Sequence, residues 1–210
     1  ATLALQRLYP GRPFAQVGFP YVDSWKVQSI LNTDSQLFPS LKQLPTNRLF
    51  RQIQQGDYCG VVMEMPSNPL LEIPDLLSFQ SVAEESETPL VVDDTLANGA
   101  NVDLLNHADA VTCSLTKYFS GSGDGMAGAL ILSTRRLLGV KLQEIVKKTS
   151  QNLLWPEDAM ELERNSRDFI QRITQSFKTA EWLVNALKEH PLIETIHYPT
   201  TIDQLGRMAY

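Results

Sequence analysis

Short apolar runs alternate with amphipathic stretches along most of the chain. Runs rich in β-branched and other apolar residues predict strands at 15–19, 58–65, 89–93, 109–114 and 128–133. Between two of them, residues 74–87 carry apolar side chains at helical spacing, and Pro74 suits a first helical position. Strands that alternate with helices favour crossover connections and a mainly parallel sheet covered by helices on both faces. We therefore expect an α/β fold.

A different pattern occupies the last part of the chain. A long helical pattern follows Pro156, and from Phe169 onward apolar residues recur on one helix face until Pro191 ends the pattern. Residues 193–199 then predict one further strand. We expect residues 1–150 to form one domain, and residues 151–210 to form a long connecting helix and the start of a second, small domain.

Composition excludes several classes of protein. The chain of 210 residues is 43% hydrophobic and 20% charged, with a formal net charge of −6. An acidic surface argues against binding to nucleic acid or to an anionic membrane. No window approaches the roughly 18 apolar residues of a membrane span, and the first residues do not resemble a signal peptide, so we expect a cytoplasmic protein. Cys59 and Cys113 have neither the spacing nor the context of a metal site or a disulfide framework.

Residues 108–128, ADAVTCSLTKYFSGSGDGMAG, form a strand end with concentrated polar chemistry. Alternation along an extended strand would point Ser114 and Thr116 to the same side, next to a glycine-rich turn. Two hydroxyls beside free backbone amides suit an anionic group such as phosphate. Lys117 follows at once and could reach a group attached to that anion.

Residues 89–95, PLVVDDT, end in acids in the same abrupt way. Alternation places Asp93 and Thr95 on one side and Asp94 on the other. Ligands of open α/β sheets collect beyond the carboxyl ends of strands, so an acid, an anion site and Lys117 would meet in one crevice. A phosphate-bearing aldehyde with a protonatable ring nitrogen would use all three, with the lysine as a Schiff base and one of the two acids paired to the pyridinium. Taken singly, each feature also suits an ordinary surface lysine, a turn or a helix cap.

Four segments resemble the Cys/Met-metabolism family of pyridoxal-phosphate enzymes, and most closely its cystathionine γ-synthase branch. They are VVMEMPSNPLLEIPDL (61–76), PLVVDDTLANGANVDLL (89–105), ADAVTCSLTKYFSGSGDGMAG (108–128) and LLWPEDAMELERNSRDF (153–169). The resemblance implies a fold-type-I large domain with pyridoxal 5′-phosphate as cofactor. It also implies that Lys117 is the catalytic residue and holds the cofactor covalently.

The same resemblance assigns cofactor-binding roles to further residues. Asp93 would bind the pyridine nitrogen, with Thr95 beside it, and Ser114 and Thr116 would bind the phosphate. Asn68 would lie near the phenolic oxygen of the cofactor and the substrate. No metal is implied.

The implied reaction is replacement of the γ-substituent of an activated homoserine by a thiol. Two alternatives remain open: a γ- or β-lyase of sulfur amino acids, and a non-catalytic paralogue that acts as a binding or assembly module. The resemblance places the family's Gly-Met phosphate site, its ring-stacking tyrosine and its carboxylate-binding arginine outside residues 1–210, so the domain is expected to be incomplete at both ends. Arg164 and Arg167 are expected to be exposed helix residues. The expected partners are an amino-acid substrate and either further copies of the chain or a complementary chain.

Overall fold

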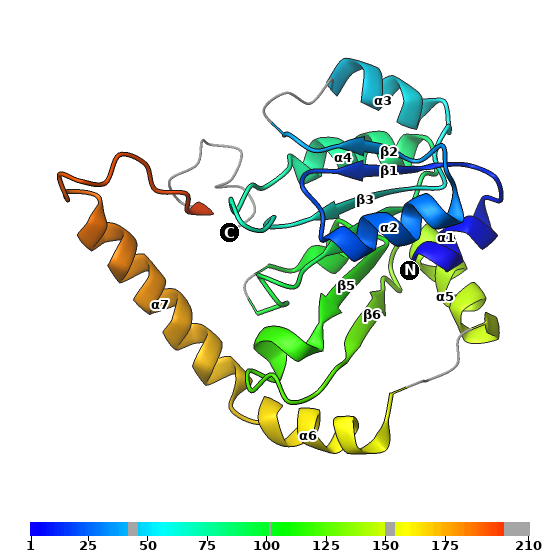
Figure 1. The fold of residues 1–210 in the computed structure, drawn as a ribbon. Coiled ribbons are helices and arrows are strands. Elements are labelled where there is room, and N and C mark those ends of the chain that lie inside the picture. The colour runs from blue at the N-terminus through cyan, green and yellow to red at the C-terminus, as the bar shows by residue number, and fades with distance from the viewer. Residues whose placement is uncertain (42–45, 101, 150–153, 200–210) are drawn as a thin grey trace.

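The computed structural model describes residues 1–41, 46–100, 102–149 and 154–199, in which helices lie on both faces of one twisted sheet (Figure 1). The helices are α1 (Thr2–Leu8), α2 (Val22–Leu31), α3 (Thr46–Gln54), α4 (Leu76–Glu85), α5 (Leu137–Thr149), α6 (Pro156–Ser166) and α7 (Phe169–Leu187). The strands are β1 (Phe14–Val17), β2 (Gln36–Phe38), β3 (Gly60–Glu64), β4 (Leu90–Asp93), β5 (Ala110–Ser114) and β6 (Gly128–Leu132). Two single turns, η1 (Leu104–Asn106) and η2 (Leu115–Phe119), complete the described elements.

The described strands form one sheet in the order β2-β1-β3-β4-β5-β6. Strands β1 to β5 run parallel, and β6 returns antiparallel to β5. This arrangement confirms the prediction of a mainly parallel sheet. The register matters for the site, because Asp93 lies between Glu64 of β3 and Thr112 of β5.

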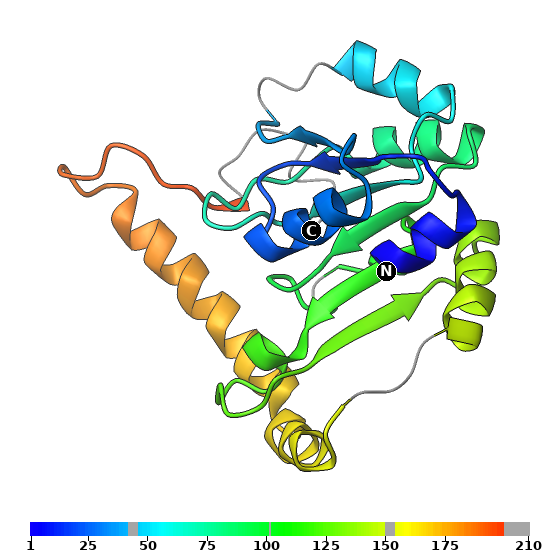
Figure 2. The same ribbon diagram turned by 45° about the vertical axis from the view of Figure 1, so that its right-hand side comes forward.

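Each face of the sheet has its own core, because successive strand residues point to opposite sides. On one face, Val61, Met63 and Val92 pack with residues of α3 and α4. On the other face, Phe14 and Val91 pack with residues of α1 and α5. Helix α2 lies on this second face as well (Figure 2), where buried Gln28 donates a hydrogen bond to Gln16 of β1 at 2.6 Å. The continuous apolar character of the inner strands follows from this double cover.

Several predicted elements differ from the structure. Helix α4 begins at Leu76, not at Pro74, because Asp75 caps it by accepting a hydrogen bond from Ser78 N at 3.2 Å. The long helical pattern after Pro156 is two helices, α6 and α7. The strand predicted at 193–199 is wrong: no strand forms over the described residues 193–199. The sequence prediction also did not include β2, a short strand whose residues are only partly buried.

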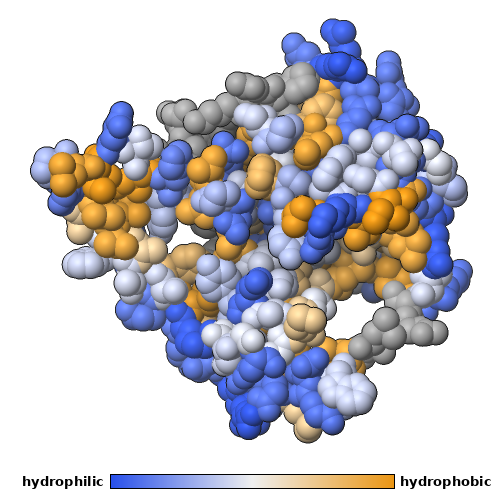
Figure 3. Space-filling view, in the orientation of Figure 1, coloured by the Kyte–Doolittle hydropathy of each residue, from blue (hydrophilic) through white to orange (hydrophobic). Residues whose placement is uncertain are grey.

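Apolar side chains remain exposed on several of the described helices, α2 and α7 among them. On α2 these are Val22, Val27 and Ile30, and on α7 they include Trp182 and Leu183. In the space-filling view, apolar residues gather over α2 and over the end of α7 (Figure 3). Within the part of the chain that the structure describes, no helix combines the length and the apolar character of a membrane span.

Candidate active site

The predicted site residues follow the carboxyl ends of three neighbouring strands. Asp93 is the last residue of β4, Ser114 is the last residue of β5, and Asn68 lies in the loop after β3. Because these strands are parallel, their carboxyl ends lie at the same edge of the sheet. Gly128, the first residue of antiparallel β6, pairs with Ser114, so the glycine-rich turn before β6 also reaches this edge.

Two hydrogen bonds fix the direction of the Asp93 carboxylate. Thr112 Oγ1 donates to Asp93 Oδ2 at 2.8 Å, and the backbone amide of Thr95 donates to Asp93 Oδ1 at 3.0 Å. The Thr95 hydroxyl accepts a hydrogen bond from Ser114 N at 2.9 Å, which joins the end of β4 to the end of β5. Each carboxylate oxygen has more than one acceptor site, so Asp93 can accept a further hydrogen bond from a ligand.

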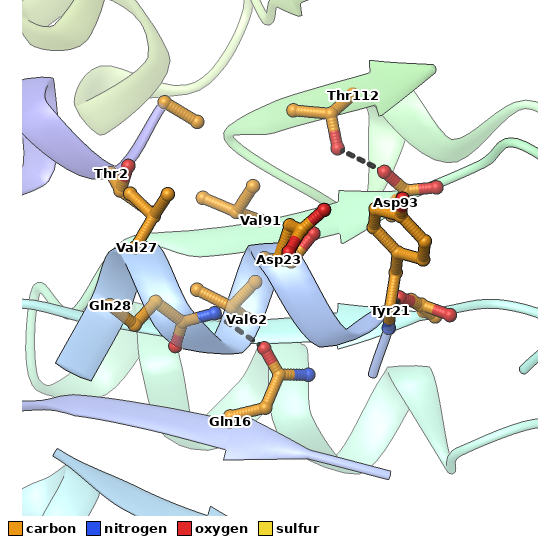
Figure 4. A pocket seen from close by; sticks show the side chains of 13 residues that line it. Thr2, Gln16, Tyr21, Asp23, Val27, Gln28, Val62, Val91, Asp93 and Thr112 are labelled. Atoms are coloured by element: carbon orange, nitrogen blue, oxygen red, sulfur yellow. Dashed lines mark hydrogen bonds between the residues drawn. The ribbon is translucent and has the colours of Figure 1, made fainter. Parts of the chain in front are cut away.

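A cavity of about 330 Å³ lies beside Asp93, between α2 and the sheet (Figure 4). Asp93 and Thr112 line it from the sheet, and Tyr21, just before α2, lines it from the other side. In Figure 4 the Tyr21 ring and the Asp93 carboxylate stand at the same end of this cavity. An aromatic face and a carboxylate in one cavity suit a flat ring with a positive charge, because the carboxylate can accept from a ring N–H.

Glu64 adds a second carboxyl group next to Asp93. The two residues are Cα partners in adjacent strands, and both line the cavity. Burial raises the pKa of Glu64, the negative charge of Asp93 raises it as well, and a hydrogen bond from the backbone amide of Tyr21 lowers it. A cationic group bound between the two carboxyls would offset their repulsion. The electrostatics of the cavity therefore favour a positively charged ring or amine.

The end of β5 differs from the sequence prediction. The strand stops at Ser114, and Leu115–Phe119 form a π-helical turn, so strand alternation does not extend to Thr116. The prediction that Ser114 and Thr116 share one side of an extended strand is therefore wrong. Thr116 Oγ1 accepts a hydrogen bond from Ala127 N at 3.0 Å, which fastens the turn to the segment before β6. Among the described residues, the Ser114 hydroxyl has no hydrogen-bond partner, so it is free to bind an anion.

Lys117 lies inside the π-helical turn, and its side chain is exposed. The turn is kinked at this residue, where φ is −80° and ψ is −112°. Asn68 is exposed too, and neither residue is among the described ones that line the cavity beside Asp93. The structure thus joins Asp93, Thr95 and Ser114 by hydrogen bonds and leaves Asn68 in a separate loop. Lys117 lies in the turn that begins after Ser114.

Asp94 points away from the cavity beside Asp93. It is 2% exposed, and its Oδ2 accepts a hydrogen bond from Gly99 N at 2.6 Å on the other face of the sheet. Burial raises the pKa of Asp94 to about 7, and the negative charge of Asp93 contributes to the rise. Of the two acids that the residue pattern left open, only Asp93 faces the cavity.

The two arginines of α6 and its end are surface residues, as expected. Arg164 pairs with Glu161, and Arg167 pairs with Glu163, each within one turn of the chain. The side chains of Arg164 and Arg167 are 65% and 70% exposed. Neither arginine is among the described residues that line the cavity beside Asp93.

The sequence prediction did not include several residues that line the cavity, among them Thr112, Glu64 and Tyr21. Thr112 precedes Ser114 by two positions, so strand alternation could have placed it on the same face. Glu64 ends the strand next to Asp93, and the run of strand ends could have suggested it. Tyr21 had no such signal, because only the packing of α2 against the sheet brings it to the cavity.

Comparison with known proteins identifies the family. The family model described as Cys/Met metabolism PLP-dependent enzyme matches residues 42–206. The chain belongs to this family. A cystathionine γ-synthase from Neurospora crassa is 38% identical over 184 residues, which cover 87% of this chain and 30% of that protein. An alanine racemase from Aspergillus violaceofuscus is 46% identical over 135 residues, which cover 63% of this chain and 23% of that protein.

Solved structures agree on the fold. A protein from Campylobacter jejuni matches all of this chain and 59% of its own, with a TM-score of 0.80 and 20% sequence identity. That structure holds an N′-pyridoxyl-lysine-5′-monophosphate. The chain therefore spans somewhat more than half of this solved protein, and less than a third of the two curated relatives.

The described residues fit pyridoxal phosphate, the cofactor of this family. Asp93 offers an oriented carboxylate for a protonated ring nitrogen, and the Tyr21 ring faces the same cavity. The Ser114 hydroxyl, which has no hydrogen-bond partner among the described residues, offers an anion ligand at the same edge of the sheet. Lys117, in the turn after Ser114, carries an amine of the kind that could react with an aldehyde.

Proposed function

We propose that this chain binds pyridoxal 5′-phosphate at the carboxyl edge of its sheet and takes part in γ-replacement on an activated homoserine with a thiol. The proposal rests chiefly on the cluster in which Asp93, Thr95 and Ser114 are joined by hydrogen bonds, with Lys117 in the turn that follows Ser114. A structural sheet has no need for this set of groups at one edge. The relatives named cystathionine γ-synthase support the reaction type.

Each group would hold a defined part of the cofactor. Asp93 would pair with the ring nitrogen, and Ser114 and Thr116 would bind the phosphate. Asn68, in the neighbouring loop after β3, would bind near the phenolic oxygen and the substrate. Lys117 would be the point of covalent attachment. When bound, the cofactor supplies an electron sink for the bonds at the substrate Cα.

The residues of this chain would direct the proton transfers. The Lys117 amine would take the proton from the substrate Cα and would return it later. In γ-replacement, the thiol sulfur forms a bond to Cγ, the bond from Cγ to the activated oxygen breaks, and the thiol proton ends on the leaving acid. In γ-elimination no thiol adds: the group at Cγ leaves as its acid, and water hydrolyses the remaining unsaturated amino acid to ammonia and a 2-oxo acid.

We further propose that residues 1–150 form part of the cofactor-binding domain and that residues 151–210 lead into a second domain. Helices α6 and α7 support this division, because α7 extends away from the sheet (Figures 1 and 2). The exposed apolar residues of α2 and α7 support a further copy or a complementary chain as the partner that covers them.

One observation favours a second candidate function. Lys117 and Asn68 are exposed and do not line the described cavity beside Asp93. A protein that had kept the fold only for binding or assembly would tolerate this arrangement. The second candidate is therefore a non-catalytic module of the same fold.

Product analysis of the purified chain separates these candidates. The chain is incubated with pyridoxal phosphate, an O-acylhomoserine and cysteine, and the products are identified by mass spectrometry. We expect the thioether amino acid, and we expect the Lys117→Ala variant to lose it. A 2-oxo acid in place of the thioether would assign a lyase. Bound cofactor without either product would assign the non-catalytic module and overturn the proposed reaction.

A further inference from the structure

Arg172 of α7 reaches into the turn that carries Lys117. Its Nη1 donates to the carbonyl of Tyr118 at 3.1 Å, and its Nη2 donates to the carbonyls of Phe119 and Ser120 at 3.0 and 3.3 Å. Its Nε donates to Asp168 Oδ1 at 2.8 Å, and this hydrogen bond helps to orient the guanidinium. One side chain thus contacts the three consecutive carbonyls that follow Lys117.

The contact has a clear physical reason. Carbonyls at the carboxyl end of a helical turn lack partners within the turn and need donors from elsewhere. A guanidinium is planar, stays charged and carries several N–H groups in a fixed fork, so it can satisfy several carbonyls at once. A lysine at the same position would present its donors on a single nitrogen, without the fixed fork of the guanidinium.

The chain leaves room for this guanidinium at Gly121. A Cβ added at Gly121 would lie 2.3 Å from Arg172 Nη1 and 2.8 Å from its Cζ. Gly121 also has a φ of +76°, which side chains other than glycine rarely adopt. Its amide donates to the carbonyl of Lys117 at 2.8 Å, so the same residue closes the turn from the other end.

Further contacts hold the same segment from the region of α6 and α7. Asn165 Nδ2 donates to Ser120 Oγ at 3.1 Å and to Asp124 Oδ1 at 2.9 Å. The rings of Phe119 and Phe169 lie 5.3 Å apart. The backbone after Lys117 is therefore fixed largely by residues that come about fifty positions later in the chain.

We infer that Arg172 is a positioning residue for Lys117: by binding the carbonyls of residues 118–120 it sets the direction in which the lysine amine leaves the turn. This inference rests on the proposed function, in which Lys117 is the covalent attachment point. If Arg172 had a purely structural role and only anchored α7 to the sheet, its substitution would affect the fixation rate and the non-covalent cofactor affinity alike.

The test compares Arg172→Met with Arg172→Lys and with a matched surface control, Arg167→Met. The rate at which added pyridoxal phosphate becomes fixed to Lys117 is followed by borohydride quenching and peptide mass mapping. We expect Arg172→Met to lower this rate by about tenfold or more, because small displacements of a reacting group have large effects. Arg172→Lys should recover part of the rate, and Arg167→Met should match the unmodified chain.

A second measurement excludes a merely structural role. Non-covalent affinity for pyridoxal phosphate is measured by absorbance in the Lys117→Ala chain, with and without Arg172→Met. If Arg172 acts through the lysine, the two affinities should agree within about twofold, because without the lysine there is no amine for Arg172 to position. The comparison is a double-mutant cycle, which shows coupling only between groups that interact. The inference would be overturned if Arg172→Met weakened cofactor affinity in the Lys117→Ala chain by the same factor by which it slows fixation. It would also be overturned if Arg172→Met left the fixation rate unchanged.

Hydrogen exchange of the chain without cofactor adds a readout that does not depend on the proposed function. In Arg172→Met, amides of residues 118–121 should exchange faster, while those of β4 and β5 should keep their protection. Unchanged exchange over residues 118–121 would contradict the inference by itself. If the unmodified chain fixes no cofactor on Lys117, while exchange responds as expected, the proposed function fails and the assigned role fails with it.

Discussion

Asp94 should make the stability of this fold depend on pH in a way that a single substitution removes. Its carboxyl is 2% exposed, accepts a hydrogen bond from the Gly99 amide, and lies next to the negative charge of Asp93. Burial is the main cause that raises the pKa of Asp94 from 3.8 to about 7. The carboxyl in the folded chain therefore keeps its proton at pH values where the unfolded chain has lost it.

The sign and size of the effect follow from proton linkage. Between about pH 4 and pH 7 the folded state binds one proton more than the unfolded state at this group, so stability falls as pH rises, by about 1.4 kcal/mol per pH unit. Over the whole interval the loss amounts to about 4 kcal/mol. The contribution is fully present below pH 4 and is lost as the pH passes through the folded value near 7.

Asp94→Asn tests this reasoning, because an amide oxygen can still accept from the Gly99 amide but carries no charge. Unfolding free energies of both chains are measured in urea from pH 4.5 to pH 8. The advantage of the variant over the unmodified chain should grow with pH up to about 7 and then level off. The exposed control Glu189→Gln should show no such growth. Parallel curves for Asp94→Asn and the unmodified chain would refute the raised pKa of Asp94.

Three further substitutions test separate contacts. Thr112→Val removes the hydrogen bond to Asp93 Oδ2 and should weaken pyridoxal phosphate binding about tenfold, the equivalent of one hydrogen bond to a charged group. Affinity is measured by absorbance titration, and unchanged affinity would mean that the bond does not orient Asp93. Gly139→Ala would bring a Cβ within 2.3 Å of the backbone carbonyl of Ser133. The unfolding free energy measured in urea should fall by about 3 kcal/mol. A loss below about 1 kcal/mol would show that α5 can shift to accommodate the methyl group. Arg136→Met leaves buried Asp109 without its ion pair and should cost about 3–5 kcal/mol by the same assay, whereas a near-neutral result would mean that the pair is solvated.

The pattern of apolar residues predicted most of the sheet because inner strands are covered on both faces. The runs around Val61, Val91 and Val111 are buried and continuous, and the observed strands lie within one or two residues of the predicted limits. Strand β2 lies at the sheet edge, where partial burial leaves a weak pattern. Residues 193–199 have β-branched residues but no neighbouring strand to pair with among the described residues, so local preference alone did not produce a strand.

The candidate site was predictable to the extent that it depends on strand order and alternation. Asp93, Thr95 and Ser114 follow from two strand ends that the fold makes neighbours. The direction of the chain after Ser114 was not predictable, because a π-helical turn replaces the extended backbone there. Tyr21 was not predictable either, since its place depends on how α2 packs on the sheet rather than on any spacing in the sequence.

Borohydride reduction after incubation with pyridoxal phosphate, followed by peptide mapping of every lysine, tests the central claim most directly. The account predicts a yellow protein with the reduced cofactor on Lys117 alone, an adduct that Asp93→Asn weakens and Lys117→Ala abolishes without unfolding the chain. A colourless protein without an adduct, or labelling spread evenly over surface lysines such as Lys141, would contradict it.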